Sequence, residues 1–369
     1  MSPFPPPNPA TARPPARCAA SWVLVLGAAG LPLTLLWDFS WESTIGIDLV
    51  WSPPHVANYL AVALAGGAAL GLLFLRKNAD GSGKLGAAVV AWGAMAFVAA
   101  FLFDRWWQAG YGLAAGIWHP PQLLKSAAFL AIAGGTWVSV ASRRAEGAAF
   151  VFAGGVVMAL ALMFTLALNF ANRQHTALFY QVASGAYPIV LVALATAGRG
   201  RFPATTGALI GMLLVAAMVW LLPLVPGSPQ VAPIYHPRDH LLPPPFPLLL
   251  IVPALALDVL LRVFPKKAAR TPGWGQATEA GLAFLAVFLA AQWPFAQFLL
   301  SPGADHWFFA GGGRQWPFFL RIAPGAETAF WTTPGDALNL PRTLLAAGLA
   351  VLSARLGLWL GAWLQRVQR

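Results

Sequence analysis

Long apolar runs dominate the chain and alternate with short polar connections. A transmembrane helix needs about 20 mostly apolar residues to cross the hydrocarbon core of a bilayer. The pattern therefore predicts an all-α fold, a polytopic membrane bundle of about ten transmembrane helices. The predicted spans are residues 20–37, 54–75, 85–103, 121–141, 148–170, 181–197, 204–222, 246–264, 276–300 and 341–364.

The bundle accounts for almost all of the chain. Residues 1–19 are rich in proline and alanine and are predicted to be a disordered cytoplasmic tail. Residues 20–369 are predicted to form a single transmembrane domain, in which residues 301–340 make a long outer loop. Pro188 makes the sixth span the weakest, and Pro294 predicts a kink or break near the outer end of the ninth.

The composition indicates that lipid is the solvent for most of the chain. The sequence is 58% hydrophobic and only 9% charged, whereas a soluble protein typically has about 25% charged residues. The net charge of +11 arises from basic residues scattered between apolar runs, so it does not predict nucleic-acid binding. The single cysteine, Cys18, excludes an internal disulfide and a thiolate metal site.

Basic residues mark one set of connections, and histidines and acidic residues mark the other. With ten spans, every basic connection falls on one side, which the positive-inside rule identifies as the cytoplasm. We therefore predict a multi-pass protein of the cell inner (cytoplasmic) membrane, with both termini in the cytoplasm. All six histidines fall on the outer side: His55, His119, His175, His236, His240 and His306.

An internal repeat relates the first two helical hairpins, residues 20–75 and 85–141. The outer loops that follow Asp38 and Asp104 share a frame: Trp three residues later, Gly eight residues later, then Trp-x-Pro-Pro before the next helix. Proline is tolerated in the first turn of a helix, so each Pro-Pro pair predicts a helix start. The frame predicts a duplicated helical hairpin; the alternative is that its residues are purely structural.

Each copy of the hairpin carries two polar side chains just after the Pro-Pro pair. They are His55 and Asn58 in the first copy and Gln122 and Lys125 in the second. Residues three apart share a helix face, so the two pairs can face one another. Lys125 is expected either to extend to the interface or to pair with an outer-loop acid. The candidate acids are Asp38, Asp48 and Asp104.

A third polar cluster precedes the eighth span and contains His236, Asp239 and His240. Two histidines four residues apart on a helical turn share one face, which is a geometry that binds metal ions. A solvated loop is the alternative. His175 is expected at the surface, and His306 lies in the long outer loop, which is expected to cover the outer face.

Imidazole and carboxylate ligands together predict a metal centre on the outer face. The cofactor would be a transition metal, with copper, zinc and iron as candidates. The proposed ligands are His55, His119, His236, Asp239 and His240. The supporting residues are Asp38, Asp48, Asp104, Asn58, Gln122 and Lys125.

Several functions fit this pattern, and the sequence does not decide whether the protein is an enzyme. The first hypothesis is a metal-binding membrane protein that serves as a subunit of a membrane oxidoreductase. The second is a structural or assembly subunit that contacts other membrane-complex subunits through its Trp-rich outer loops. The third is a lipid-linked group transferase that uses the acids of the first outer loop. A transporter is less expected, because few polar residues fall in the middle of the predicted spans.

Overall fold

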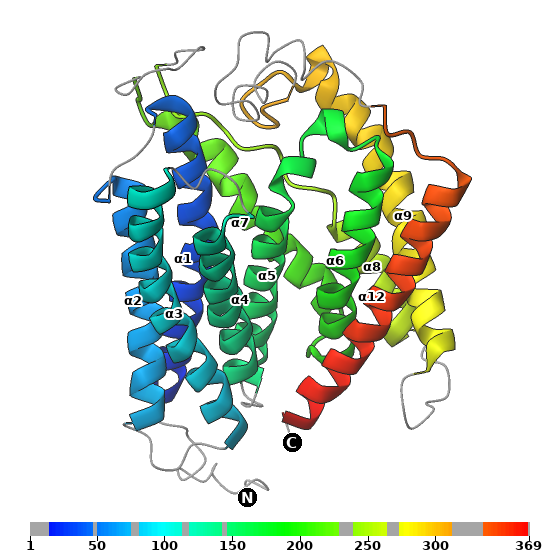
Figure 1. The fold of residues 1–369 in the computed structure, drawn as a ribbon. Coiled ribbons are helices and arrows are strands. Elements are labelled where there is room, and N and C mark those ends of the chain that lie inside the picture. Colours follow the sequence, from blue (N-terminus) through cyan, green and yellow to red (C-terminus); the bar gives the residue numbers. More distant parts are fainter. Residues whose placement is uncertain are drawn as a thin grey trace, which may run out of the picture.

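The structure is a computed structural model that describes residues 15–46, 50–74, 81–112, 118–141, 146–228, 239–263, 273–311 and 335–367. These residues form an all-α bundle (Figure 1). The long helices are α1 (Pro15–Thr44), α2 (Pro53–Phe74), α3 (Gly81–Tyr111), α4 (Pro120–Ala141), α5 (Gly147–Phe164), α6 (Ala177–Ala197), α7 (Pro203–Leu221), α9 (Trp274–Leu300) and α12 (Leu340–Val367).

The long helices have the length and composition of membrane spans. Within the described residues, nine helices are long and apolar enough to cross a bilayer. A shorter tenth helix, α8 (Ile251–Asp258), completes the set. The predicted fold class, an all-α polytopic membrane bundle, is confirmed, and the chain is a multi-pass membrane protein.

The two ends of the bundle differ in charge. Figure 1 shows that α1 begins and α12 ends at the same end of the bundle, which we call the basic end. Its described cations are Lys84, Arg199, Arg201, Arg262 and Arg366. At the opposite end, which we call the histidine end, lie the described histidines His55, His119, His175, His240 and His306. The described histidines follow the predicted alternation, whereas Arg105, Arg173 and Arg342 also lie at the histidine end. The cytoplasmic location of the basic end stays a prediction.

The eighth crossing is broken, and here the expected helix over 246–264 is corrected. Residues 241–249 have no regular secondary structure and are almost completely buried. The chain becomes helical only in α8, which continues as a π-helical turn, η5 (Val259–Val263). Prolines at positions 243, 244, 245 and 247 explain the break, because proline removes a backbone donor and clashes with the preceding helical turn.

Non-helical backbone at membrane depth must find its hydrogen-bond partners within the protein. The Leu242 N–H donates to the Thr44 hydroxyl (3.2 Å), and the Leu242 carbonyl accepts from the Ser40 hydroxyl (2.6 Å). At the other end of the segment, the Leu249 N–H donates to Gln292 Oε1 (2.8 Å). The four prolines have no N–H to satisfy. The broken crossing is thereby held between α1 and α9.

A pair of charged side chains joins α8 and η5 to the connection between α6 and α7. The Asp258 carboxylate accepts hydrogen bonds from the N–H groups of Ala204 (3.2 Å) and Thr205 (2.8 Å), at the start of α7. Arg262, one turn later, donates to the carbonyls of Ala195 (3.0 Å) and Gly198 (2.7 Å), at the end of α6. A carboxylate at a helix start and a cation at a helix end both interact favourably with the helix dipole.

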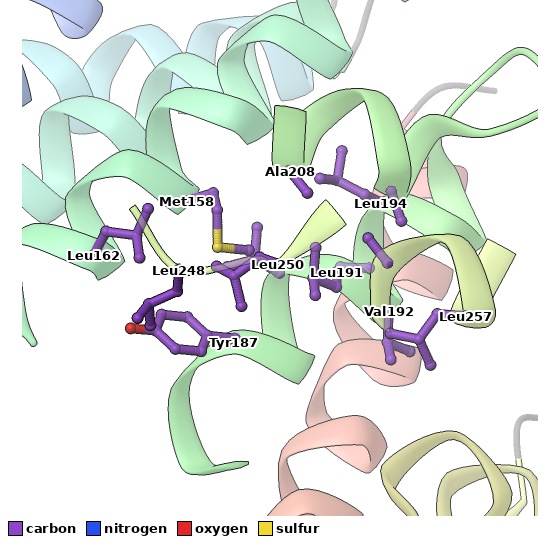
Figure 2. Close-up of a cluster of buried hydrophobic side chains, with 14 of the residues drawn as sticks. Met158, Leu162, Tyr187, Leu191, Val192, Leu194, Ala208, Leu248, Leu250 and Leu257 are labelled. Atoms are coloured by element: carbon purple, nitrogen blue, oxygen red, sulfur yellow. The ribbon is translucent and has the colours of Figure 1, made fainter. Parts of the chain in front are cut away.

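Leucines of the broken crossing enter the larger apolar core. Figure 2 shows Leu248 and Leu250 among side chains of α5, α6 and α7, close to Met158 and Tyr187. Two other prolines, which were expected to weaken or break their spans, do not interrupt a helix. Helix α9 is continuous across Pro294, so the ninth span is not broken, and α6 is continuous across Pro188.

Candidate functional site

The two N-terminal hairpins position the predicted polar residues in equivalent places. Helices α2 and α4 are both 22 residues long and both begin at a Pro-Pro pair. Their first turns close in the same way, because Val56 N–H donates to the Ser52 carbonyl and Leu123 N–H to the His119 carbonyl, each at 3.0 Å. These features agree with a duplicated hairpin, and its superposition stays a prediction.

His55 and Asp38 form the main contact of the first hairpin. The His55 Nε2 lies 3.5 Å from Asp38 Oδ1, so the end of α1 meets the start of α2 at the histidine end. Both side chains are about one quarter exposed, at 25% and 21%. The Tyr59 ring lies 6.1 Å from the His55 ring, and its hydroxyl donates to the Val50 carbonyl (3.0 Å). This packing fixes the imidazole beside the carboxylate.

Two more oxygen atoms at this end are buried without a hydrogen bond. Asn58 Oδ1 and Asp104 Oδ1 accept none from any described residue, although Gln108 Nε2 donates to the other Asp104 oxygen (3.0 Å). Tyr59 contacts Phe101 with ring centroids 5.6 Å apart, one turn before Asp104 on α3. Asp104 therefore lies at about the level of His55, on the neighbouring helix.

The second hairpin holds its polar residues differently. The His119 ring packs against Trp107 with centroids 6.3 Å apart. Lys125 is partly buried, and it forms no ion pair with Asp38 or Asp104 among the described residues. The ion pair of Lys125 with an outer-loop acid stays a prediction, and Asp48 lies outside the described residues. Gln122 is also partly buried.

The third predicted cluster is described only in part, because His236 lies outside the described residues. Asp239 and His240 form an adjacent pair, with Oδ1 and Nδ1 2.5 Å apart, and the Asp239 side chain is 93% exposed. Residues 225–227 pair with residues 239–241 through Leu241 N–H to Val225 O and Gly227 N–H to Asp239 O, both 2.9 Å. His240 therefore lies in extended backbone that pairs with residues 225–227, and not in a helical turn.

Of the predicted metal ligands that the structure describes, only Asp239 and His240 contact each other, and His55 contacts a residue predicted to support the site, Asp38. Across the described stretches of the chain, no group of three or more His, Cys, Asp or Glu side chains is close enough to hold a metal ion. Any metal centre built on one of these pairs therefore needs further ligands, such as amide oxygens or water.

Comparison of the chain with known proteins found no matching protein-family model, no matching curated protein and no matching solved structure. The function must therefore be argued from the side chains and their surroundings.

A buried polar group that links α9 to the connection between α5 and α6 is missed by the sequence reasoning. Gln292 Nε2 donates to Gln174 Oε1 (2.6 Å), and Gln174 Nε2 donates to the Asn169 carbonyl (2.6 Å). Asn169 Nδ2 in turn donates to the Leu162 carbonyl (2.8 Å). Gln174 and Gln292 are both fully buried. The one signal in the sequence is a glutamine close to Pro294 within an otherwise apolar span.

His175 differs from the expected surface histidine. Its ring meets Trp293 edge-on with centroids 4.6 Å apart, and its Nε2 lies 3.2 Å from the Trp293 carbonyl oxygen. Burial lowers the pKa of His175 from its ordinary value, and the hydrogen bond to the Trp293 carbonyl offsets only part of that effect. Neutral imidazole is therefore the form that packs against α9.

Proposed function

We propose that this multi-pass membrane protein binds a transition metal ion at the histidine end, with His55 and Asp38 as its central ligands. The observation that carries the proposal is the largely buried imidazole–carboxylate pair across α1 and α2. The two buried acceptor oxygens of Asn58 and Asp104 support it, because a buried oxygen without a donor is suited to a cation.

The donor set limits the metal. Imidazole suits zinc, copper and iron, whereas carboxylate and amide oxygens suit harder ions. The Asp38 carboxylate would orient the His55 ring or share the ion with it, as carboxylates beside metal-binding histidines do. His119, His236, Asp239 and His240 stay candidate ligands, and Asp239–His240 is the more exposed pair. Service as a subunit of a membrane oxidoreductase is part of this proposal.

A second candidate function is that of a structural or assembly subunit. It is favoured by exposed tryptophans at the histidine end, including Trp51 (77% exposed) and Trp118 (79%). Tryptophan is enriched both at membrane interfaces and at protein–protein contacts. The transferase alternative has less support, because Asp38, predicted to lie in the first outer loop, lies within α1 and contacts His55.

Metal content tests the proposal directly. Purified protein without a histidine tag, loaded with one metal at a time and desalted, is expected to retain zinc, copper or iron by elemental analysis. His55→Ala should retain several-fold less, because it removes the only imidazole of the pair. His306→Ala should retain as much as the parent, since His306 lies in another part of the histidine end and contacts Phe309.

Two results would contradict the metal proposal. One is a parent protein that retains no metal under any loading condition. The other is equal retention by the parent and by His55→Ala. In either case the structural-subunit function would become the leading candidate.

A further inference from the structure

The short connection between α6 and α7 presents two arginines at the basic end. Residues 198–202, which we call the arginine turn, read Gly-Arg-Gly-Arg-Phe. The side chains of Arg199 and Arg201 form no ion pair and no hydrogen bond with any described residue. Guanidinium groups bind phosphate through several N–H donors at once. The turn therefore has the charge and the donors to bind an anion from outside the chain.

The backbone of the arginine turn is held in a defined position. Arg262 donates to the carbonyls of Gly198 (2.7 Å) and Gly200 (2.8 Å), which lie on either side of Arg199. Asp258 accepts from two backbone N–H groups at the start of α7. Gly200 has a φ of +91°, in the left-handed region that favours glycine. The two arginines are thus displayed from a fixed turn, and Arg262 adds its own positive charge beside it.

The neighbours of each arginine leave its guanidinium donors available. The aliphatic stem of Arg199 lies against Gly147, at the start of α5. Arg201 is exposed, and its guanidinium carbon lies 5.1 Å from the centre of the Phe202 ring, within the range of a cation–π contact. Neither contact occupies the guanidinium N–H groups with an acceptor, so both side chains can donate to a phosphate.

The backbone offers further donors on this turn. The N–H groups of Gly200 and Arg201 donate to no atom of the described residues. A Cβ placed on Gly200 would meet no atom within 4 Å, so there is open space beside the turn. Successive backbone N–H groups in a turn form concave sites for anions. Amide and guanidinium donors are therefore available together to one anionic group.

An apolar face of α7 begins at the arginine turn. Beyond Phe202, the exposed residues Thr206, Leu209 and Leu213 follow at helical spacing and share one side of α7. Leu209 is 40% exposed and Leu213 is 48% exposed. In a membrane span, exposed leucines of this kind contact acyl chains. An anion that carries acyl chains can therefore contact both the turn and this face, whereas a free phosphate ion can use only the turn.

We propose that the arginine turn and the adjoining face of α7 form a binding site for an anionic phospholipid. The lipid phosphate accepts hydrogen bonds from Arg199, Arg201 and the backbone of the turn, and an acyl chain lies along Leu209 and Leu213. Basic sites between transmembrane helices bind anionic head groups in the same manner. The site lies at the opposite end of the bundle from His55, so it does not depend on the metal proposal.

Native mass spectrometry of the purified, delipidated protein tests this site. The probes are phosphatidylglycerol and phosphatidylcholine with identical acyl chains, added separately at equal concentrations. The parent is expected to retain several-fold more phosphatidylglycerol, because only that lipid has a net negative charge. Arg199→Ala combined with Arg201→Ala should lose most of this preference. Glycerol 1-phosphate should displace the bound lipid only at a much higher concentration, since it has no acyl chain.

Lys84→Ala combined with Arg105→Ala is the matched control. This variant also loses two positive charges, both from α3, and should keep the preference of the parent. Equal retention of the two lipids by the parent would overturn the proposal. Equal losses in the two double variants would also overturn it, because binding would then follow net charge alone. Displacement by glycerol 1-phosphate as effective as that by phosphatidylglycerol would show a site for soluble phosphate and not for a lipid.

Discussion

Replacement of Gln292 by leucine is expected to destabilise the protein by about 3 kcal/mol. The side chain is fully buried and makes two hydrogen bonds, one from the Leu249 N–H and one to Gln174. Leucine fills a similar volume but satisfies neither group. Each buried partner left without a bond costs roughly 1–3 kcal/mol. Denaturation in mixed micelles measures the change.

Gln297→Leu is the matched control for this variant. Gln297 lies five residues further along α9, where it is exposed. The same substitution there removes no buried bond, so a change within about 0.5 kcal/mol is expected. Equal stability of Gln292→Leu and Gln297→Leu would show that the glutamine does not hold the broken crossing in place.

Asp258→Ala is expected to cost about 3 kcal/mol or more. The fully buried carboxylate accepts from two backbone N–H groups of α7 and from the Thr205 hydroxyl (2.8 Å). Its removal leaves these donors buried without an acceptor and removes the electrostatic attraction between Asp258 and Arg262. The start of α7 and the end of α6 would then lose their common attachment to α8 and η5.

An exposed aspartate provides the comparison for Asp258. Asp239→Ala removes a carboxylate that is 93% exposed and faces its neighbour His240, so it should change stability by less than about 1 kcal/mol. Asp258→Asn is informative as well, since an amide keeps the shape but loses the charge. A stable Asp258→Ala variant, with a denaturation midpoint equal to that of Asp239→Ala, would contradict the proposed attachment.

Most of the helices follow from the hydrophobic pattern alone. The helix starts at Pro53 and Pro120 can be predicted, because a proline pair followed by an apolar run is compatible with the first helical turn. The same reasoning fails for the eighth crossing. Its prolines at 243–245 predict a helix start, but a further proline at 247 extends the non-helical segment to Leu249.

The candidate site could be predicted only within one hairpin. His55 and Asp38 belong to consecutive helices, so the repeat places them at the same end of the bundle, and the structure brings them into contact. The hydrogen bond between Gln174 and Gln292 joins residues 118 positions apart. Such contacts depend on how α6 and α9 pack, which helical periodicity does not specify.

The transporter hypothesis also shows that the sequence does not specify how the helices pack. The sequence disfavours it, because Asn169 and Gln292 fall near the outer ends of their predicted spans. In the structure both are buried beside the broken crossing, where their bonds reach Leu162 and Leu249. Discontinuous spans next to polar groups are typical of binding sites within membranes. The position of a residue along a span is therefore a poor guide to its surroundings when a neighbouring span is not helical.

We expect the chain to cross the membrane ten times, with the eighth crossing made by the broken segment and α8. Single cysteines at Ser228 and Gly273, both exposed and on either side of this crossing, test this central claim most directly. In a Cys18→Ser background, a membrane-impermeant maleimide should label Ser228→Cys on intact cells and Gly273→Cys only after permeabilisation. Labelling of both positions from the same side would show that the segment does not cross, and would contradict the ten-crossing topology.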